Sequence, residues 1–368
     1  KSKMKQTIIL LHLALFGLLA ACSKSENKSG ISSRLDSIMV AHKDFSGVVL
    51  VANQGQPVYF KAYGFRDFET NEPMDTSSVF ELASVSKAFT AMIIMMLAED
   101  GRLSYEDSLS RFIPNLPYRG ITIRHLLNHT SGLPDYQAVM DQHWDKSRVA
   151  SNADNIAYLI QYRPPRSFEP GTRYEYSNTG YMLLASVAEQ ASGQDFLTLL
   201  QERIFSPLGM TMTSVRTKAE KDQLPNMAWG HIWVNERKAF IKADSFPAFN
   251  YTIWLGNRKG PGRISSTVRD MLRWDRALYG TQLISDQTRT EAFSPALLKD
   301  GTRSMYGFGW DLELDSTRGK IVRHSGDNPG YKTQFIRFID RDYTIILLCN
   351  NALEGFDELT QQLQNSVK

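Results

Sequence analysis

The pattern of apolar residues predicts β-strands near both ends of the chain and helices between them. Residues 47–52 and 57–63 are rich in β-branched and aromatic side chains and flank an Asn-Gln-Gly sequence, which predicts a β-hairpin. Three further runs of this kind, at 321–325, 333–339 and 343–349, are separated by turn-forming residues and predict an antiparallel meander. The simplest arrangement pairs the hairpin with the meander in one sheet.

Helical patterns occupy much of the remaining chain. Residues 31–42 place apolar side chains on one face, whereas residues 88–98 are almost wholly apolar and predict a central helix buried on all sides. Further helices are predicted at 121–128, at 180–191 with Gly193 as the C-terminal cap, at 265–278, and at 353–367 over the meander.

These elements predict an α/β (α+β) fold, with an antiparallel sheet flanked by helices. We expect a sheet lobe formed by about 31–82 together with 255–368, and a mostly helical lobe formed by about 83–254. An active site is expected in the cleft between the two lobes.

The first 30 residues have the character of an export signal and a linker. Three lysines precede an apolar stretch at 8–21, which is short for a membrane span and typical of a secretory signal. The stretch ends in Leu-Ala-Ala before Cys22, which resembles the bacterial lipobox, so we expect residues 1–21 to be a signal peptide and Cys22 to be lipidated. Residues 22–30 predict a flexible tether. An uncleaved anchor, or a cysteine that follows small residues by chance, is the alternative.

This interpretation places the mature protein in the bacterial cell envelope, lipid-anchored and periplasmic, with the inner or the outer membrane left undecided. It also changes the charge balance of the 368-residue chain, which has 42 Lys and Arg, 39 Asp and Glu and a formal charge of +3. Residues 1–21 hold three Lys and no acid, so 39 basic and 39 acidic residues remain. Because the basic residues are also scattered, we expect no nucleic-acid partner. Cys349 is then the one remaining cysteine, expected to be buried and unreactive.

Several well-known catalytic signatures are absent from the sequence. It contains no G-x-S-x-G nucleophile elbow, no H-E-x-x-H, no P-loop and no G-x-G-x-x-G. His125 and His129 have helical spacing, but no acidic residue lies between them, so packing and hydrogen bonding at a helix end is a better interpretation than a zinc site. We expect no metal and no cofactor.

A serine and a lysine three residues apart lie at the start of the predicted buried helix. Ser84 and Lys87 would lie one turn apart on the same face of that helix. The helix N-terminus offers free backbone N–H groups to an oxyanion, and the apolar residues that follow keep the amine dry and lower its pKa. Ser84 is thus a candidate nucleophile, and a simple helix-capping role is the alternative.

A second candidate motif consists of Tyr176 and Asn178, the single Y-x-N sequence in the chain. It lies between a Pro-Gly turn and a predicted helix. A phenol near a lysine ammonium has a lowered pKa and can relay a serine proton, and an asparagine can hydrogen-bond a substrate amide. Capping of the helix by Ser177 or Asn178 is the simpler alternative.

A third candidate motif consists of His324, Ser325 and Gly326, at the end of a predicted strand before a Pro-Gly turn. The glycine would allow a substrate backbone to approach the strand edge closely, and the histidine and serine offer donors to a substrate carboxylate. A strand-end histidine with a satisfied hydrogen-bond partner is the alternative.

The order and wide separation of these three motifs resemble the penicillin-recognising serine hydrolases, which include class C β-lactamases, DD-peptidases and related esterases. Signatures of that superfamily are S-x-x-K, S-D-N and K-T-G. Here the second is Tyr-Ser-Asn, as in class C enzymes, and the third is His-Ser-Gly, closer to DD-peptidases that carry His-Thr-Gly. Residues 121–136, 176–193 and 265–278 also resemble this family, and the resemblance runs from about residue 31 to the end of the chain.

The resemblance implies a β-lactamase/DD-peptidase-like fold and acyl transfer through a covalent serine ester, without metal or cofactor. Ser84 would be the nucleophile, Lys87 its activating neighbour and Tyr176 the proton shuttle, with the choice of Lys87 or Tyr176 as general base left open. The remaining site residues would be Asn178, His324, Ser325 and Gly326 for substrate binding, and the backbone N–H groups of Ser84 and Asp327 as the oxyanion hole.

The histidine of the third motif departs from the lysine of K-T-G. A histidine with an ordinary pKa of about 6.5 is largely neutral at pH 7.5, so capture of an anionic substrate by His324 is expected to be weak and to strengthen in acid. We therefore expect a D-amino-acid peptidase of DD-carboxypeptidase type or an esterase, acting on peptides or esters, with weak activity on β-lactams. A non-catalytic envelope lipoprotein that binds cell-wall peptides is the alternative from a different class.

Overall fold

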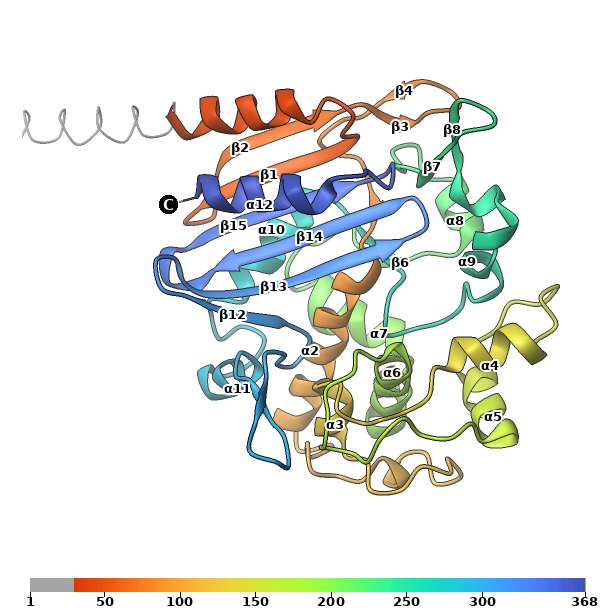
Figure 1. The fold of residues 1–368 in the computed structure, drawn as a ribbon. Coiled ribbons are helices and arrows are strands. Elements are labelled where there is room, and N and C mark those ends of the chain that lie inside the picture. Colours follow the sequence, from red (N-terminus) through yellow and green to blue (C-terminus); the bar gives the residue numbers. More distant parts are fainter. Residues whose placement is uncertain (1–29, 368) are drawn as a thin grey trace, which may run out of the picture.

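A six-stranded antiparallel sheet dominates the computed structural model, which describes residues 30–367 (Figure 1). The expected signal peptide, Cys22 and most of the tether lie outside the described residues. The strands follow the order β12-β13-β14-β15-β1-β2. Their bounds are Asp311–Asp315 for β12, Gly319–Asn328 for β13, Tyr331–Phe338 for β14, Tyr343–Cys349 for β15, Gly47–Asn53 for β1 and Gln56–Tyr63 for β2.

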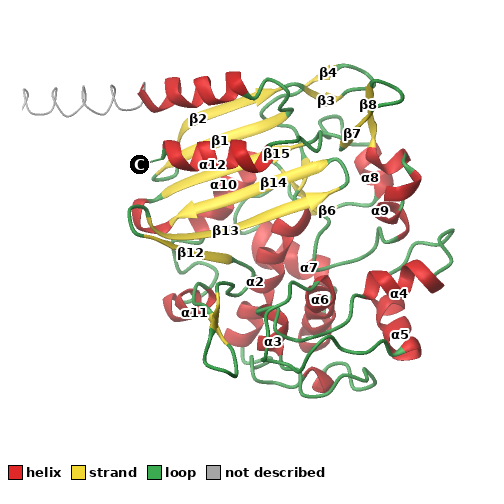
Figure 2. Cartoon of the chain, viewed as in Figure 1, coloured by secondary structure: helices red, strands yellow, loops and turns green. Residues whose placement is uncertain are grey.

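The expected pairing of the hairpin with the meander is confirmed, because β1 pairs with β2 on one side and with β15 on the other. Helices cover both faces of this sheet (Figures 1 and 2). The helix over residues 30–41 and α12 (Phe356–Ser366) pack with Val49 and Val51 on one face, whereas α10 (Val268–Ala277) packs with Val48 and Leu50 on the other. Burial of both faces explains the continuous apolar run of β1.

The predicted central helix is α2 (Ser86–Glu99), and its residues from Ser86 to Leu97 are buried. Below the sheet in Figure 1 it packs against α6 (Asn178–Ser192), which ends at Gly193 in the left-handed conformation expected of a C-terminal cap. The 3₁₀ turn η1 (Ala83–Val85) leads directly into α2 and contacts β13 and β14. The start of the buried helix therefore lies against the sheet.

The other elements are short and surround this frame. The helices are α3 (Ile123–Leu127), α4 (Tyr136–His143), α5 (Asn152–Tyr162), α7 (Phe196–Leu200), α8 (Lys218–Asp222), α9 (Tyr251–Trp254) and α11 (Asp286–Ala292), with helical turns at Leu109–Arg111, Gln201–Phe205, Ala243–Ser245, Pro247–Phe249 and Ile339–Arg341. The strands are β3 (Phe65–Asp67), β4 (Glu72–Pro73), β5 (Phe80–Glu81), β6 (Ser214–Val215), β7 (His231–Val234), β8 (Ala239–Lys242), β9 (Ile264–Ser266), β10 (Ala296–Leu297) and β11 (Arg303–Ser304). Within residues 30–367 no helix combines the length and the apolar character needed to cross a membrane.

Two differences from the predicted elements have clear physical causes. The helix expected at 265–278 begins at Val268, because Ser265 and Ser266 pair with β5 and Thr267 caps the helix. The edge strand β12 was not predicted, since its sequence is mostly polar, Leu312 is its one buried residue and Leu314 is 73% exposed.

Candidate active site

Ser84 lies on a tight turn between the short strand β5 and helix α2. The preceding residue, Ala83, has a φ of +48°, in the left-handed region that residues other than glycine seldom adopt. The sheet holds this turn in place, because Thr333 Oγ1 donates a 2.9 Å hydrogen bond to the Leu82 carbonyl and the Leu82 N–H donates to the Ile264 carbonyl at 2.8 Å. The backbone at the predicted nucleophile is thus both strained and firmly supported.

Lys87 is completely buried, and its Nζ contacts three oxygens. These are Ser84 Oγ at 3.0 Å, Asn178 Oδ1 at 2.8 Å and the Pro261 carbonyl at 2.8 Å. Burial, assisted by the nearby Arg258 guanidinium, holds the pKa of Lys87 well below its ordinary value. The expectation of a dry lysine with a lowered pKa beside Ser84 agrees with this geometry.

The Tyr-Ser-Asn motif enters the site at the start of α6. Ser177, the middle residue of the motif, caps that helix by accepting a 3.1 Å hydrogen bond from the Gly180 N–H. The helix-capping role considered as an alternative is therefore also present. On either side of Ser177, Asn178 contacts Lys87, and the Tyr176 ring lies 4.7 Å from Lys87 Nζ, measured to its centroid. The structure thus brings Ser84, Lys87, Tyr176 and Asn178 together.

The expected lowering of the Tyr176 pKa is wrong. Although 41% of Tyr176 is exposed, desolvation of the phenol raises its pKa, and a hydrogen bond with the Ser84 hydroxyl only partly opposes the increase. The reason is geometric: Lys87 Nζ lies over the face of the ring, as in a cation–π contact, and so does not stabilise a phenolate oxygen. Tyr176 is therefore a neutral phenol near pH 7.

We expected His324 to bind an anionic substrate more strongly in acid. This expectation is also wrong, because the pKa of His324 is far from its ordinary value. His324 is buried, donates from Nδ1 to the Ser325 carbonyl at 2.6 Å and accepts at Nε2 from the Tyr306 hydroxyl at 2.9 Å. Burial, assisted by the neighbouring Lys87, lowers the pKa of His324 to about 3. The alternative of a histidine with satisfied hydrogen-bond partners therefore describes this ring well. With this pKa the ring is neutral near pH 7.

The rest of the third motif lies along the edge of β13 next to η1. A Cβ on Gly326 would overlap Thr333 Oγ1 and the Leu82 carbonyl, so only glycine lets β13 approach the nucleophile turn this closely. Ser325 is exposed on the other face of the strand, and Asp327 follows at the end of β13, paired with Lys332 in the sheet register. The proposed oxyanion donor thus lies on a strand in contact with the turn of Ser84.

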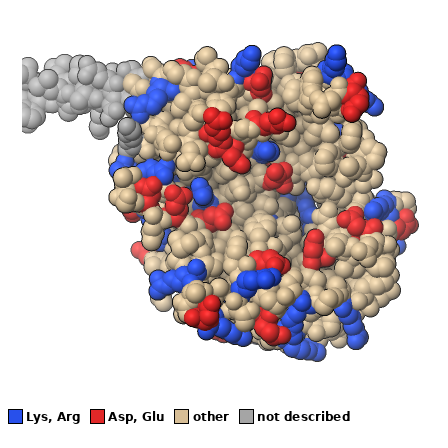
Figure 3. Space-filling model, in the orientation of Figure 1, with Lys and Arg blue, Asp and Glu red and all other residues tan. Residues whose placement is uncertain are grey.

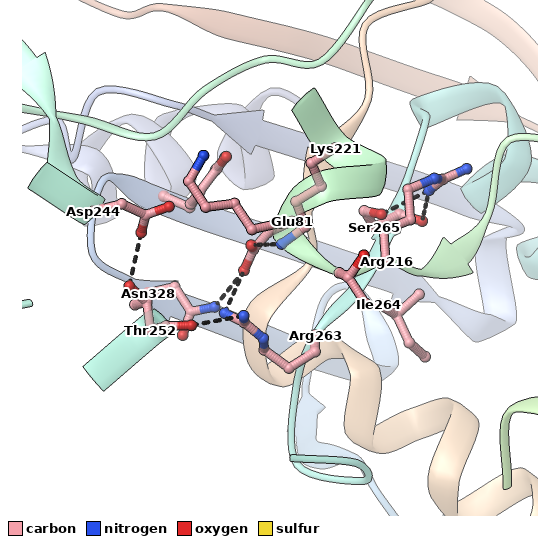
Figure 4. A network of polar contacts seen from close by, with 12 residues as sticks. Glu81, Arg216, Lys221, Asp244, Thr252, Arg263, Ile264, Ser265 and Asn328 are labelled. Carbon is pink, nitrogen blue, oxygen red and sulfur yellow. Dashed lines mark hydrogen bonds and ion pairs between the residues drawn. The ribbon is translucent and has the colours of Figure 1, made fainter. Parts of the chain in front are cut away.

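A buried ionic network links the strand before the nucleophile turn to the turn between β13 and β14 (Figure 4). Glu81 in β5 pairs with Lys221 of α8 and lies 3.7 Å from the Arg263 guanidinium, and Asn328 Nδ2 donates to Glu81 at 3.0 Å. Arg263 also donates to the Thr252 carbonyl at 2.7 Å. Burial acts to raise the pKa of Glu81, but the two cations outweigh burial and hold the pKa at about 2. The Glu81 carboxylate therefore connects the segment that leads to Ser84 with the residue that follows Asp327, and these two segments carry the two candidate oxyanion-hole N–H groups.

His129 also belongs to the candidate site. The sequence predicted that it packs and hydrogen-bonds at a helix end, but not that it contacts the second motif. The Ser177 N–H donates to its Nδ1 at 3.0 Å, and its ring lies 4.4 Å from the Tyr176 ring and 4.6 Å from the Tyr306 ring, centroid to centroid. His125, by contrast, accepts from the Thr122 N–H within its own helix cap. The two histidines therefore serve different purposes, and His129 orients the second motif.

Comparisons with known proteins found similar sequences and structures. A sequence model described as Beta-lactamase matches residues 34–365. The chain is 39% identical over 328 residues to penicillin-binding protein 4* of Bacillus subtilis (strain 168), covering 89% of this chain and 72% of that protein. It is 28% identical over 334 residues to a D-aminopeptidase of Brucella anthropi, covering 88% of this chain and 59% of that longer protein. The crystal structure of a penicillin-binding protein from Bacillus halodurans matches with a TM-score of 0.77 at 24% identity, covering 90% of this chain and 98% of that one.

The expected fold and enzyme class are confirmed by these comparisons together. The structural match supports the β-lactamase and penicillin-binding-protein fold, in which an antiparallel sheet is combined with helices. Because the family match spans nearly all described residues and the Bacillus subtilis relative is matched over most of its length, the chain belongs to the β-lactamase family of serine hydrolases.

Proposed function

We propose that the protein hydrolyses amide bonds next to D-amino acids through a covalent ester on Ser84, as a D-amino-acid peptidase of DD-carboxypeptidase type. The contacts of Lys87 carry the proposal. Two of its partners, Asn178 Oδ1 and the Pro261 carbonyl, can only accept hydrogen bonds. A neutral amine gives its two N–H groups to these acceptors and keeps its lone pair for the third partner, the Ser84 hydroxyl. Lys87 is thereby a general base aimed at the nucleophile.

The reaction begins when Ser84 Oγ attacks the carbonyl carbon of the scissile amide and its proton passes to Lys87 Nζ. The oxyanion of the tetrahedral intermediate is held by the backbone N–H groups of Ser84 and Asp327. As the C–N bond breaks, neutral Tyr176 donates its proton to the leaving nitrogen and takes one from Lys87. Water then attacks the ester by the same route, releasing the acid and restoring the Ser84 hydroxyl.

The substrate class is supported by the relatives and by the orientation of Asn178. The similar proteins bear the names penicillin-binding protein 4* and D-aminopeptidase. With Oδ1 of Asn178 occupied by Lys87, its Nδ2 is left to donate to an amide carbonyl of the substrate. A side-chain amide fixed in this way favours peptide-like substrates.

An esterase is the second candidate, and the neutral state of His324 favours it. Because burial lowers the pKa of His324 to about 3, the third motif provides no positive charge to a substrate carboxylate. A neutral ester loses nothing by this, whereas a β-lactam or a peptide with a free C-terminus gains no ion pair with His324 and has only neutral hydrogen bonds for its carboxylate there. We therefore also propose that β-lactamase activity is weak, and retention of neutral-ester hydrolysis in His324→Ala would favour the esterase.

Labelling with a fluorescent penicillin and a fluorophosphonate tests the proposed nucleophile. We expect covalent label on the wild type and on Ser77→Ala, a matched change at an exposed serine, and none on Ser84→Ala. Release of D-alanine from D-alanyl-D-alanine peptides and hydrolysis of p-nitrophenyl esters then distinguish peptidase from esterase. Absence of label and of turnover from folded wild type would instead favour the non-catalytic binder of cell-wall peptides.

We further propose that the protein is a lipid-anchored envelope protein, supported by the lipobox-like sequence before Cys22. The test is metabolic labelling with a radioactive fatty acid, followed by membrane fractionation. Label and membrane association are expected for the wild type and should be lost in Cys22→Ala. Equal labelling of both forms would contradict the anchor without affecting the proposed chemistry.

A further inference from the structure

Arg258, in the loop between α9 and β9, is a buried arginine without an acidic partner. It is 8% exposed, and among residues 30–367 no carboxylate forms an ion pair with it. Within the same residues its guanidinium makes one hydrogen bond, from Nη1 to the Tyr136 hydroxyl, while its Nε is buried without a partner. The other buried arginines of the described chain, Arg263 and Arg337, each lie within ion-pair distance of a carboxylate.

The groups around Arg258 do not neutralise its charge. Burial raises the pKa of Tyr136, although the guanidinium opposes the increase, so the hydroxyl stays neutral. The charge of Glu81 reaches Arg258, but this carboxylate already has Lys221 and Arg263 as partners. A guanidinium keeps its proton even when buried, so Arg258 is a cation that a bound anion would stabilise.

The loop that carries Arg258 is held firmly against the helices of the site. Thr90 of α2 donates to the Gly260 carbonyl at 2.7 Å, and the Lys259 N–H donates to Asn152 Oδ1 at 2.9 Å. These contacts come directly after Arg258 in the chain. The guanidinium is therefore held in position before any ligand binds, which lowers the entropy cost of binding.

Arg258 lies next to the nucleophile turn. A Cβ added to Gly262 would lie 3.7 Å from the Ala83 carbonyl oxygen and 3.8 Å from Arg258 Nη2, so both groups border the space beside this glycine. The charge of Arg258 also acts on the pKa of Lys87 and of Tyr176. A substrate group that contacts the guanidinium would therefore be only a few bonds from a carbonyl carbon at Ser84.

The anchoring of Tyr136 indicates which part of a substrate reaches Arg258. The Tyr136 N–H donates to Thr179 Oγ1 at 3.0 Å, so the residue that holds the guanidinium is fixed beside Asn178. Asn178 is the proposed partner of a substrate amide other than the scissile one, and when a single amino acid leaves, that amide lies in the acyl part. A group at Arg258 is therefore expected in the acyl part.

The surroundings strengthen the attraction for an anion. Charged side chains of both signs lie around a hollow in the face shown in Figure 3, near the level at which α2 meets the sheet in Figure 1, and uncharged atoms predominate inside it. An ion pair formed away from bulk water is stronger than one on an open surface. The planar guanidinium also matches a carboxylate, because two N–H groups can contact two oxygens.

We propose that Arg258 is a specificity residue that binds a carboxylate in the acyl part of the substrate, through the N–H groups of its guanidinium that have no partner in the protein. The proposal rests on the proposed acyl transfer at Ser84 and adds the charge of the acyl group to it. A dicarboxylic acyl cap or an acidic side chain close to the scissile amide would supply such a carboxylate.

Two substrates that differ by one charge test this assignment. They are Nα-succinyl-D-Ala p-nitroanilide and the matching succinamide, in which a neutral amide replaces the free carboxylate. We expect the wild type to prefer the acid about tenfold in kcat/KM, as for one charge-assisted hydrogen bond, and Arg258→Met to reduce the ratio to about one. Lys259→Met is the matched control, since it removes the charge of the next residue, which already pairs with Glu189 and Asp195, and should keep the preference.

Urea denaturation separates recognition from a structural role. Because Arg258→Met removes a buried charge that has no acidic partner, we expect its unfolding midpoint to be no lower than that of the wild type. A lower midpoint with the charge preference unchanged would make Arg258 a structural residue and overturn the proposal.

Calorimetric binding of both compounds to Ser84→Ala separates this inference from the proposed function. Tighter binding of the acid, lost on combining Ser84→Ala with Arg258→Met, supports the assignment whether or not the wild type turns the compounds over. Absence of turnover with this preference intact would overturn the proposed acyl transfer alone. Equal binding of the two compounds, or a preference that survives Arg258→Met, would overturn the role of Arg258.

A second pair of ligands, acetyl-D-Ala-D-Ala and its C-terminal amide, places the charge in the leaving group instead. We expect Arg258→Met to leave the binding ratio of this pair unchanged. If Arg258→Met altered this ratio and not that of the succinyl pair, the carboxylate at Arg258 would belong to the leaving group, and its placement in the acyl part would be wrong.

Discussion

The buried network around Glu81 should respond very differently to the loss of its anion and the loss of one of its cations. Glu81 has three partners, Lys221, Arg263 and Asn328, all in contact with the same carboxylate. The change Glu81→Gln leaves two buried cations facing each other, with only the weaker attraction of Asp244 on Lys221 remaining. The change Lys221→Met leaves the carboxylate with Arg263 and Asn328 and keeps an apolar chain of similar length in place.

The magnitudes follow from this difference in partners. Removing one member of a buried ion pair costs about 3–5 kcal/mol when it leaves an uncompensated charge, so we expect a loss in this range for Glu81→Gln. For Lys221→Met we expect about 1–2 kcal/mol, because Arg263, 3.7 Å away, still neutralises Glu81. The double variant Glu81→Gln/Lys221→Met should be more stable than Glu81→Gln alone, since it removes one of the two stranded cations.

Urea denaturation followed by circular dichroism at pH 7 measures these differences. Lys218→Met is the control, because Lys218 and Asp222 form an exposed pair on the same helix and its loss should cost under about 1 kcal/mol. Since the folded pKa of Glu81 lies at about 2, below its ordinary 4.5, its contribution is complete above pH 4.5 and is lost as the pH falls toward 2. Equal losses for Glu81→Gln and Lys221→Met, or simple additivity in the double variant, would refute this reasoning.

Three further predictions concern catalysis. Gly326→Ala should lower the acylation rate about 100-fold, because the added Cβ overlaps the Leu82 carbonyl and moves β13 away from the nucleophile turn; stopped-flow labelling with a fluorescent penicillin measures this, and an unchanged rate would contradict it. His129→Asn keeps an acceptor for the Ser177 N–H, so it should retain more acylation than His129→Leu, whereas equal losses would mean that only ring packing matters. Between pH 7.5 and 5, kcat/KM for an anionic substrate should gain nothing from His324, whose pKa of about 3 keeps it neutral; an increase in acid that His324→Asn abolishes would disprove this.

The parts of the fold that could be predicted are those in which burial alone determines the pattern. The run 88–98 had to be a buried helix, and the β-branched runs at both ends had to pair, because no other arrangement covers so much apolar surface. The edge strand β12 escaped prediction because its alternation is short and polar. The start of α10 was misplaced because Ser265 and Ser266 pair with a strand from a distant part of the sequence.

The sequence predicted which residues form the candidate site, but it did not predict their protonation states. Ser84, Lys87, Tyr176 and Asn178 are found together as their motifs indicated. The pKa directions of Tyr176 and His324 were wrong because both depend on desolvation and on which atom faces a charge. The spacing of residues in a sequence shows neither how far a group is desolvated nor which of its atoms faces a charge. The hydrogen-bonding role expected of His129 is found, but its partner Ser177 could not be predicted, since it lies 48 residues away.

The charges around the site explain why a neutral amine stands beside the nucleophile and why the third motif carries no second cation. Arg258 is buried near Lys87 and helps to keep its pKa low, so a second cation in the third motif would add repulsion to a pocket that already disfavours charge. A neutral His324 avoids that repulsion but gives up attraction for a substrate carboxylate.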